Sequence, residues 1–319
     1  MSMPDVMGVI LAAGKGTRMR PFSEHYPKPI LPLGGKPLLA HQLEMMKSVG
    51  VEHVVIVIGH LGHQVVREIG DGERFGLRIE YVEQGETLGI AHAVYKLERF
   101  VDRPFFLFLG DIYFETENLA SMPEQMMGPG GADAVLAVKR EPDAEKMRRN
   151  FVVLTEANGR VHRVVEKPRF AKTDLKGCGI YLFDQSFFDA VRRTPRTAMR
   201  DEYEITDAIQ IYIEDGYRVE AAEVIRDDLN LSYPMDLLDL NLRWLDAHGG
   251  RNMIGRGVQV ADGAVLERCL LMDGAVVEKP IHMRDCLVFP NVRVRHERDL
   301  SRTILTQETE ISDNVDAAP

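Results

Sequence analysis

The sequence predicts an α/β protein, in which a doubly wound, mostly parallel sheet is followed by a short, degenerate β-helix at the C-terminus. Two observations carry this prediction. Up to about residue 225, short apolar runs alternate with amphipathic segments of helical length, as in sheets whose strands are covered by helices. Beyond Gly249-Gly250, apolar residues instead recur near every sixth position, which is typical of stacked β-helical coils.

The first strand is the apolar run at residues 6–11, and the next elements alternate regularly after it. We expect further strands at residues 53–58, 77–82 and 104–111, and helices at residues 37–48, 63–69 and 89–99. In a sheet of this kind, ligands bind at the carboxyl ends of the strands. Gly14 and Asp111 both lie at such ends.

The stretch from residue 134 to residue 183 is richer in strands. Its apolar runs lie at residues 134–138, 151–155, 160–166 and 179–183. The turn residues Asn158-Gly159 predict a hairpin between two of them. We interpret this stretch as an antiparallel insertion that forms the floor of an acceptor pocket. Helices at residues 204–214 and 234–247 follow.

The change of pattern near Gly249-Gly250 predicts two domains. Residues 1–250 form the larger one, which ends in the linker helix 234–247, and residues 251–319 form the β-helix. A set of ordinary short strands is the alternative for the second domain. Glycine, usual in hexapeptide repeats, is mostly absent there, and the period slips near Pro280.

Composition limits the functional classes. The chain has 319 residues and a net charge of −10, which argues against nonspecific binding to nucleic acid or to an anionic membrane. The three cysteines, Cys178, Cys269 and Cys286, lie far apart without CxxC spacing, so we expect neither disulfides nor a zinc site. No apolar run reaches the length of a membrane span. We therefore expect a cytoplasmic protein.

The turn after the first strand carries the strongest functional signal. It reads Gly14-Lys15-Gly16-Thr17-Arg18, and its glycines let the backbone approach a polyphosphate closely. Residues 14–36 contain five basic side chains and one acidic side chain, in a chain that is acidic overall. The spacing fits neither a P-loop nor a dinucleotide-binding fingerprint. A nucleoside triphosphate is the small anionic ligand that fits this pattern best.

The whole segment, LAAGKGTRMRPFSEHYPKPILPLGGKP at residues 11–37, resembles the signature of the nucleotide-sugar pyrophosphorylases, or sugar-1-phosphate nucleotidyltransferases. The resemblance covers about residues 6–240 and implies a Rossmann-like catalytic domain. It implies that a phosphate oxygen of the acceptor attacks the α-phosphorus of the triphosphate and expels pyrophosphate. It also implies that the β-helix is left-handed and that the protein forms a homo-oligomer through it.

The resemblance assigns the triphosphate to the early loop. Arg18 and Lys28 are expected to hold the β- and γ-phosphates and to stabilise the leaving pyrophosphate, and are the catalytic candidates. The expected nucleotide-binding residues are Leu11, Ala12, Ala13, Gly14, Lys15, Gly16, Thr17, Gln84 and Gly89. The LAAG form of the turn favours UTP or CTP over dTTP and GTP.

Magnesium is the cofactor implied by the resemblance. Mg²⁺ is usually held by one or two carboxylates together with substrate phosphates. Asp111, in the string Leu-Gly-Asp, is the first expected ligand. The second is Asn230, four residues before the helix-opening Pro234, with nearby Asp228 as an alternative.

The acceptor half departs from the family pattern. Val165-Glu166-Lys167-Pro168 matches its Glu-Lys-Pro element, so Glu166 and Lys167 are expected to bind the acceptor, together with Phe151 and Gly179. The family commonly has glycine at position 151 and asparagine at position 177, whereas this chain has phenylalanine and glycine. The phenyl ring would fill part of a hexose pocket, and Gly177 would restore part of that volume.

The leading hypothesis is Mg²⁺-dependent transfer of a nucleotidyl group from a nucleoside triphosphate to a sugar 1-phosphate. The altered positions 151 and 177 leave open a cytidylyltransferase that acts on a non-sugar phosphate or phosphonate, such as a phosphocholine-like compound or an inositol phosphate. A catalytically silent subunit that senses nucleotide sugars is the alternative of another class.

Overall fold

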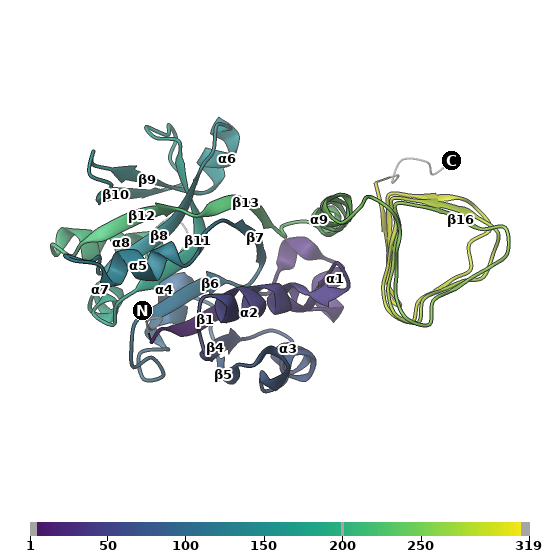
Figure 1. Ribbon diagram of the computed structural model, residues 1–319, viewed down its shortest axis with the longest axis horizontal. Helices are drawn as coiled ribbons and strands as arrows, with labels where there is room; N and C mark the ends of the chain where they lie inside the picture. Colours follow the sequence, from purple (N-terminus) through teal and green to yellow (C-terminus); the bar gives the residue numbers. More distant parts are fainter. Residues whose placement is uncertain (1–4, 199–200, 314–319) are drawn as a thin grey trace. The chain divides into compact units, whose positions relative to one another are not determined.

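A computed structural model describes residues 5–198 and 201–313 of the chain (Figure 1). The chain divides into two compact units. The first contains residues 1–14 and 39–229, and the second contains residues 15–38 and 230–319. Residues 15–38, which we call the signature loop, therefore belong to the same unit as the β-helix, although more than 200 residues separate them in sequence.

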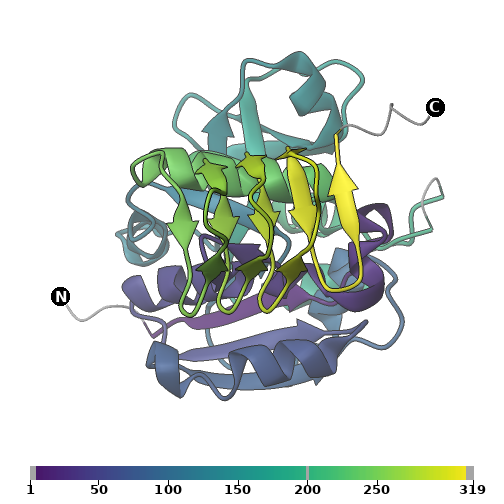
Figure 2. The same ribbon diagram turned by 90° about the vertical axis from the view of Figure 1, so that its right-hand side faces the viewer.

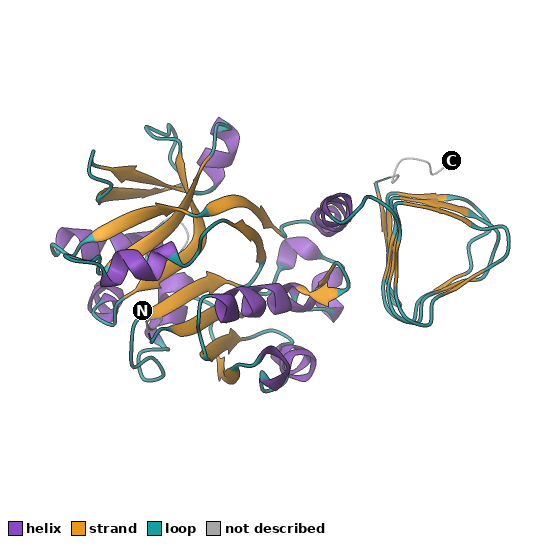
Figure 3. Cartoon of the chain, in the orientation of Figure 1, coloured by secondary structure: helices purple, strands orange, loops and turns teal. Residues whose placement is uncertain are grey.

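The first unit is built on a nine-stranded sheet (Figure 3). One half is parallel, with strands in the order β6 (Phe105–Leu109), β1 (Met7–Ala12), β4 (His53–Ile58) and β5 (Arg78–Glu83). Helices α2 (Leu38–Ser48), α3 (Gly62–Ile69) and α4 (Ile90–Tyr95) lie between these strands in sequence. The predicted elements are confirmed here, with two differences. Strand β6 ends at Leu109, before the turn at Gly110-Asp111, and α4 ends at Tyr95, after which residues 96–100 form turns.

The other half of the sheet is mainly antiparallel. Strand β11 (Leu175–Phe183) runs antiparallel to β6 and pairs with β8 (Ala134–Arg140) and β9 (Phe151–Thr155). Strand β10 (Val161–Glu166) forms the predicted hairpin with β9, and β12 (Val219–Glu223) lies parallel to β8. The α/β prediction is confirmed. The sheet is mixed rather than mostly parallel, because the antiparallel insertion continues the parallel half instead of forming a separate layer.

Several short elements carry too few residues to show a period in the sequence. They are α1 (Phe22–His25), β2 (Pro32–Leu33), β3 (Lys36–Pro37), β7 (Ile112–Thr116), α5 (Ser121–Met127), α6 (Ala144–Arg149), α7 (Phe187–Arg193) and β13 (Ile225–Asn230), together with β12. Strands β7 and β13 pair with each other. Helix α6 begins where the Asp143 side chain accepts hydrogen bonds from the amides of Glu145 and Lys146.

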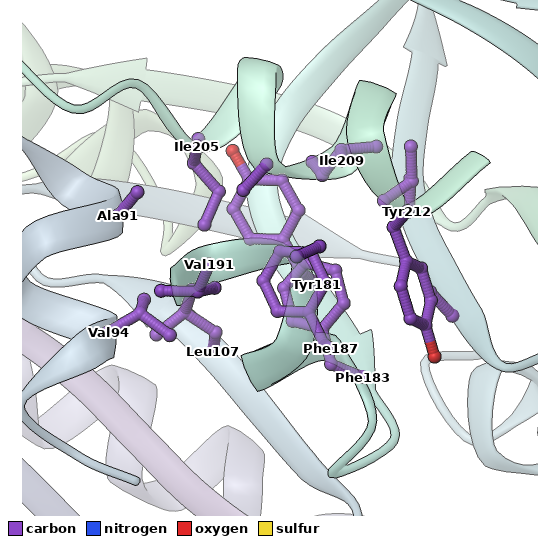
Figure 4. Close-up of a cluster of buried hydrophobic side chains, with 14 of the residues drawn as sticks. Ala91, Val94, Leu107, Tyr181, Phe183, Phe187, Val191, Ile205, Ile209 and Tyr212 are labelled. Atoms are coloured by element: carbon purple, nitrogen blue, oxygen red, sulfur yellow. The ribbon is translucent and has the colours of Figure 1, made fainter. Parts of the chain in front are cut away.

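An aromatic cluster forms the core of this unit (Figure 4). Tyr181 and Phe183 on β11 stack on each other, and Phe187 on α7 stacks on Phe183 with ring centroids 3.7 Å apart. Tyr212, on α8 (Ile205–Glu214), meets the Phe187 ring edge-on. Such pairs stabilise a core beyond the burial of their apolar area. They fix α7 and α8 against β11.

The second unit contains α9 (Pro234–Ala247), where the sequence predicts a helix. Pro234 occupies the first turn, where a missing N–H costs nothing, and the Asp236 carboxylate accepts hydrogen bonds from the amides of Ser232 and Tyr233. The sharp start of this helix therefore follows from two residues.

Residues 253–312 form a left-handed parallel β-helix, which Figure 2 shows with its coils stacked side by side. Met253 pairs with Leu270, Leu270 with Leu287 and Leu287 with Ile304, so each coil takes 17 residues. A coil of 17 is one residue short of three hexapeptides, which explains why the predicted sixfold period slips. The predicted β-helix, rather than a set of ordinary short strands, is confirmed.

Three parallel sheets make the walls of the β-helix. The first sheet contains β14 (Met253–Ile254), β17 (Leu270–Leu271), β20 (Leu287–Val288), β23 (Thr303–Leu305) and β24 (Glu310–Ser312), of which β24 runs antiparallel to β23. The second sheet contains β15 (Gln259–Val260), β18 (Val276–Val277) and β21 (Arg293–Val294). The third sheet contains β16 (Val265–Glu267), β19 (His282–Arg284) and β22 (Leu300–Ser301). Among the described residues, no helix is long and apolar enough to cross a membrane.

Candidate active site

The carboxyl ends of the four parallel strands form one edge of the sheet. The register pairs Leu11 with Leu109, Ala12 with Ile58 and Ile58 with Glu83. The residues that follow these ends therefore lie along the same edge, in the order Asp111, Ala13, Gly59 and Gln84. The chain moves from β1 outward through β4 and β5 and returns beside β1 at β6. Such a reversal of strand order is where open α/β sheets bind ligands.

Two glycines at this edge allow the strand ends to approach closely. A Cβ atom on Gly59 would lie 2.6 Å from the carbonyl oxygen of Ala13. A Cβ atom on Gly110 would lie 2.8 Å from the carbonyl oxygen of Leu11. Both distances are shorter than a van der Waals contact, so any side chain would push the turn after β1 away. The sequence prediction missed both glycines, although each directly follows an apolar run.

Gln42 fixes the turn that carries Asp111. Its side chain is buried on α2, and its Nε2 atom donates hydrogen bonds to the carbonyl oxygens of Leu109, at 2.8 Å, and Ile112, at 2.7 Å. These two residues flank Gly110-Asp111 on either side, so one amide group sets the exit of β6 and the entry of β7. Nothing in the sequence distinguishes Gln42 from other polar helix residues.

Gln84 and Gly89, two of the predicted nucleotide-binding residues, are held through their backbones. The amide of Gln84 donates to the carbonyl oxygen of Ile58 at 2.9 Å, and the Lys96 ammonium donates to the Gln84 carbonyl. Gly89 has a φ of 104°, and a Cβ atom there would lie 2.5 Å from the carbonyl oxygen of Tyr203. Only glycine suits this position, because the left-handed conformation and the close contact coincide.

The acceptor candidates lie on β9, β10 and β11 or directly after β10. Glu166 lies directly opposite Phe151 in the antiparallel pair, which puts both side chains on one face. The Phe151 ring stacks on Tyr181 with centroids 6.0 Å apart. Burial and then the Glu166 carboxylate raise the pKa of the Tyr181 hydroxyl, so this phenol stays protonated.

Two further acceptor candidates have left-handed backbone conformations. Lys167 has a φ of 43°, which is uncommon for a residue with a side chain, and its Nζ atom lies 3.6 Å from a carboxylate oxygen of Glu166. Gly179 has a φ of 77°, and a Cβ atom there would lie 3.0 Å from side-chain carbons of Leu109 and Ile112. Gly179 therefore packs against the strands on either side of the Asp111 turn.

An ionic cluster joins β13 to β8 and β11. The Asp228 carboxylate, 5% exposed, accepts hydrogen bonds from the Lys176 ammonium at 2.6 and 2.7 Å and lies 3.0 Å from that of Lys139. Lys139 also pairs with Asp227 at 2.8 Å and with Glu141 at 3.4 Å. Burial lowers the pKa of Lys139, but its hydrogen bonds to Asp227 and Asp228 outweigh that effect and raise it. Asp228 is therefore engaged with two ammonium groups.

The two expected magnesium ligands each offer an oxygen atom. Asp111 is half-buried in the turn after β6, and Asn230 is exposed at the end of β13. Asp111 belongs to the first unit and Asn230 to the second. Among the described residues, no three His, Cys, Asp or Glu side chains cluster in a way that could hold a metal. Carboxylate and amide oxygens are both ligand types that Mg²⁺ uses, together with water and phosphates.

Within the second unit, the signature loop packs the Lys28 side chain against Gly16, two residues before Arg18. The Lys28 side chain passes along Gly16, where a Cβ atom would lie 3.0 Å from Cε of Lys28. Gly16 has a φ of 61°, so glycine suits it on both counts. Arg18 is exposed, and its guanidinium lies 5.9 Å from the centre of the Tyr233 ring. Lys15 and Thr17 are also exposed.

A model of the nucleotidyl transferase family matches residues 7–247. The chain belongs to this family. The resemblance noted in the signature segment is confirmed, and the protein is an enzyme of the nucleotidyltransferase class. A second model, the GlmU-like C-terminal hexapeptide, matches residues 246–317. The division of the chain at residue 250 stays a prediction, because the compact units group the signature loop with the β-helix instead.

Relatives of this nucleotidyltransferase carry sugar-specific names. It is 34% identical to the UTP–glucose-1-phosphate uridylyltransferase AglF of Haloferax volcanii, over 72% of this chain and 93% of the relative. It is 32% identical to a glucose-1-phosphate thymidylyltransferase of Streptomyces griseus, over 88% of this chain and 75% of the relative. A solved structure from Bacillus anthracis, assigned as a glucose-1-phosphate thymidylyltransferase, superposes with a TM-score of 0.66 at 26% identity, over 76% of this chain and 96% of that one.

Proposed function

We propose that this enzyme transfers a nucleotidyl group from a nucleoside triphosphate to a sugar 1-phosphate and releases pyrophosphate. The observation that carries the proposal is the signature loop, in which the Lys28 side chain passes along Gly16 and the exposed Arg18 follows Thr17. The names of the relatives support a sugar 1-phosphate as the acceptor.

The reaction needs positioning and charge neutralisation more than covalent help. A phosphate oxygen of the acceptor forms a bond to the α-phosphorus, the bond between that phosphorus and the oxygen bridging to the β-phosphorus breaks, and pyrophosphate leaves with the bonding electrons. Arg18 and Lys28 bind the β- and γ-phosphates. Their positive charges stabilise the negative charge that builds on the leaving group.

Asp111 and Asn230 would hold Mg²⁺ through one carboxylate and one amide oxygen. The bound ion would neutralise phosphate charge and so reduce repulsion between the two substrates. Asn230 contributes no charge, so we expect weak binding of the metal until the nucleotide arrives. The two lysines on Asp228 disfavour it as a ligand, because its carboxylate is already neutralised.

On the acceptor side, Glu166 binds hydroxyl groups and Lys167 binds the phosphate. Phe151 and Gly179 shape the pocket from β9 and β11. For the nucleotide, we propose UTP or CTP over dTTP and GTP on the basis of Ala12-Ala13 in the turn. AglF is named for UTP and the Streptomyces relative for a thymidylyl group, so family membership alone does not choose the base.

A second candidate function is cytidylyl transfer to a smaller, non-sugar phosphate or phosphonate. The Phe151 ring, which occupies the space above Gly177, favours it, because this ring reduces the room for a hexose. A silent sensing subunit is disfavoured, since such a subunit has no need of Arg18, Lys28 and Asp111 together.

A substrate panel tests these proposals. Each of UTP, CTP, dTTP and GTP is combined with several sugar 1-phosphates, phosphocholine and an inositol phosphate, and pyrophosphate release is measured with and without Mg²⁺. We expect turnover with a pyrimidine ribonucleotide and a sugar 1-phosphate, and none with the Asp111→Asn variant. Turnover with non-sugar acceptors alone would replace the first proposal with the second.

A further inference from the structure

We infer that the β-helix holds the signature loop in place, and that Phe289 is a positioning residue for Arg18 and Lys28. The inference rests on the proposed function for the roles of these two cations. Its structural basis lies entirely within the second unit, to which both the loop and the β-helix belong.

Phe289 lies between two aromatic residues of the loop. It follows β20, and its ring stacks on Phe22 with centroids 6.0 Å apart and planes 17° apart. The Tyr26 ring meets Phe289 edge-on at 5.4 Å. Phe22 and Phe289 are both almost completely buried. Aromatic contacts of this kind fix the relative orientation of the groups that carry them.

A polar contact extends this attachment. The Tyr26 hydroxyl donates a hydrogen bond of 2.8 Å to a carboxylate oxygen of Glu308, which lies between β23 and β24. Burial, followed by the Glu308 hydrogen bond and charge, raises the pKa of Tyr26, so the hydroxyl stays protonated and remains a donor. A residue far along the β-helix thereby reaches the loop directly.

The end of the loop is held separately, by α9. The buried Asn241 side chain donates to the carbonyl oxygen of Pro32 at 2.8 Å and accepts from the amide of Gly34 at 3.0 Å. The Trp244 ring covers Gly34 so closely that a Cβ atom there would lie 2.2 Å from it. These contacts fix residues 32–34, whereas Phe289 and Glu308 contact the earlier residues Phe22 and Tyr26.

The attached residues lie between the two cations in sequence. Arg18 precedes α1 by four residues, and Lys28 follows it by three. Phe22 and Tyr26 are the first residue of α1 and the residue just after its last, and their backbones are joined by a hydrogen bond of 2.8 Å. A shift of this single turn against Phe289 would therefore move both cations. Misplacement of a binding group by about 1 Å can cost about 100-fold in rate.

Three variants separate positioning from stability. Phe289→Ala removes the ring between Phe22 and Tyr26. Leu271→Ala is the matched control, because Leu271 is equally buried in β17 but lies in an earlier coil. Phe289→Leu keeps apolar volume at the contact. Steady-state kinetics for the triphosphate, thermal unfolding and amide hydrogen exchange of residues 15–38 are measured for all three and for the wild type.

For Phe289→Ala we expect kcat/KM for the triphosphate to fall by about tenfold or more, and amide exchange in residues 19–30 to accelerate. In Phe289→Leu, kcat/KM and amide exchange should both return part of the way to the wild-type values. Leu271→Ala should lower the melting temperature but leave kcat/KM and amide exchange unchanged. The inference would be overturned if Phe289→Ala kept the kinetics and the amide exchange of the wild type. It would also be overturned if Phe289→Ala and Leu271→Ala lost equal amounts of kcat/KM. If the wild-type protein were inactive with every substrate pair, the proposed function would be refuted. The amide exchange of residues 15–38 would still decide whether Phe289 holds the loop.

Discussion

The Phe151 ring occupies the space that a side chain at residue 177 would need. A Cβ atom on Gly177 would lie 1.8 Å from Cζ of Phe151. The two departures from the family pattern in the acceptor half are therefore one coupled change, in which glycine on β11 makes room for phenylalanine on β9. Phe151 is buried, since it is only 7% exposed, and its ring fills space beside β11 that a glycine at position 151 would leave open.

This coupling predicts non-additive stabilities. Gly177→Ala should destabilise the protein by about 1–3 kcal/mol through overpacking, and Phe151→Ala by about 3 kcal/mol or more through a cavity. In the double variant, the new methyl group enters the space that the ring has left. Urea unfolding of the four proteins should show a coupling free energy of at least about 1 kcal/mol, whereas additive losses would show that the two sites are independent.

Gln42 predicts a change in metal dependence. Gln42→Met keeps the length of the side chain but leaves the carbonyl oxygens of Leu109 and Ile112 without their donor. The Asp111 turn should loosen, and the Mg²⁺ concentration for half-maximal velocity should rise several-fold. Gln64→Met, on α3, is the control, and it should leave the metal dependence unchanged. An unchanged Mg²⁺ requirement in Gln42→Met would remove the link between this amide and Asp111.

Substitutions of Asn230 and Asp228 should affect different properties, the Mg²⁺ requirement for Asn230 and the stability for Asp228. Asn230→Asp adds a charge at the proposed ligand position, so the Mg²⁺ concentration needed for half-maximal velocity should fall by about tenfold. Asp228→Asn should instead leave two buried lysines short of a partner and cost about 3 kcal/mol or more of stability, with little change in the metal requirement. Should Asp228→Asn raise the metal requirement without loss of stability, Asp228 is the ligand.

Arg140 provides a comparison for the buried cluster. Its guanidinium pairs with Asp174 and Glu223 at 2.9 and 2.8 Å, but on the surface. Arg140→Ala should hardly change stability, because solvent screens exposed ion pairs. Urea unfolding measures this change. A large loss of unfolding free energy in Arg140→Ala would show that exposed ion pairs stabilise this protein as much as the buried pairs of Asp228 do.

Arg18 is predicted to act on the chemical step. Arg18→Ala should lower kcat by about 10²–10³-fold, the usual effect of removing one electrostatic donor from a transition state. The expected signature is a fall in kcat with a smaller change in KM for the triphosphate. A rise in KM at constant kcat would restrict Arg18 to substrate binding.

The first coil of the β-helix is the predicted face for a second copy of the chain. Ile254, Val260 and Val265 are 50%, 39% and 50% exposed, and their strands β14, β15 and β16 are edge strands of the three sheets. Open strand edges with apolar side chains favour pairing. Val260→Lys combined with Val265→Lys should shift the mass measured by light scattering toward the monomer. A wild-type mass equal to that of the variant would contradict an interface at this coil.

The sequence was sufficient for the elements with a strong local signal. Strand β4 and helix α9 lie at the predicted residues, because one is an uninterrupted apolar run and the other begins at Pro234. The 17-residue coil is harder to recognise, because 17 is not a multiple of six. Phe22, Tyr26 and Phe289 show no local pattern at all. Their association depends on contacts between residues more than 250 apart, as does the hydrogen bond from Tyr26 to Glu308.

The candidate site also contains residues that the local sequence predicts and residues that it does not. Gly16, Gly89 and Gly179 could be proposed from motifs, because each has a left-handed conformation that glycine alone adopts easily. Gln42 and Gly110 act through backbone atoms of other segments, and such roles leave no residue-type signature. Asp228 was proposed from proximity in sequence, but its two lysine partners come from β8 and β11 and could not be foreseen.

The most direct test is phosphorus NMR of a mixture of the enzyme, Mg²⁺, UTP and a sugar 1-phosphate. The account predicts that the γ- and β-phosphate signals of UTP decline as pyrophosphate and a new nucleoside diphosphate ester appear in equal amounts, and that Arg18→Ala slows both equally. Spectra that stay unchanged with all four triphosphates, or that show orthophosphate and nucleoside diphosphate instead, would contradict it.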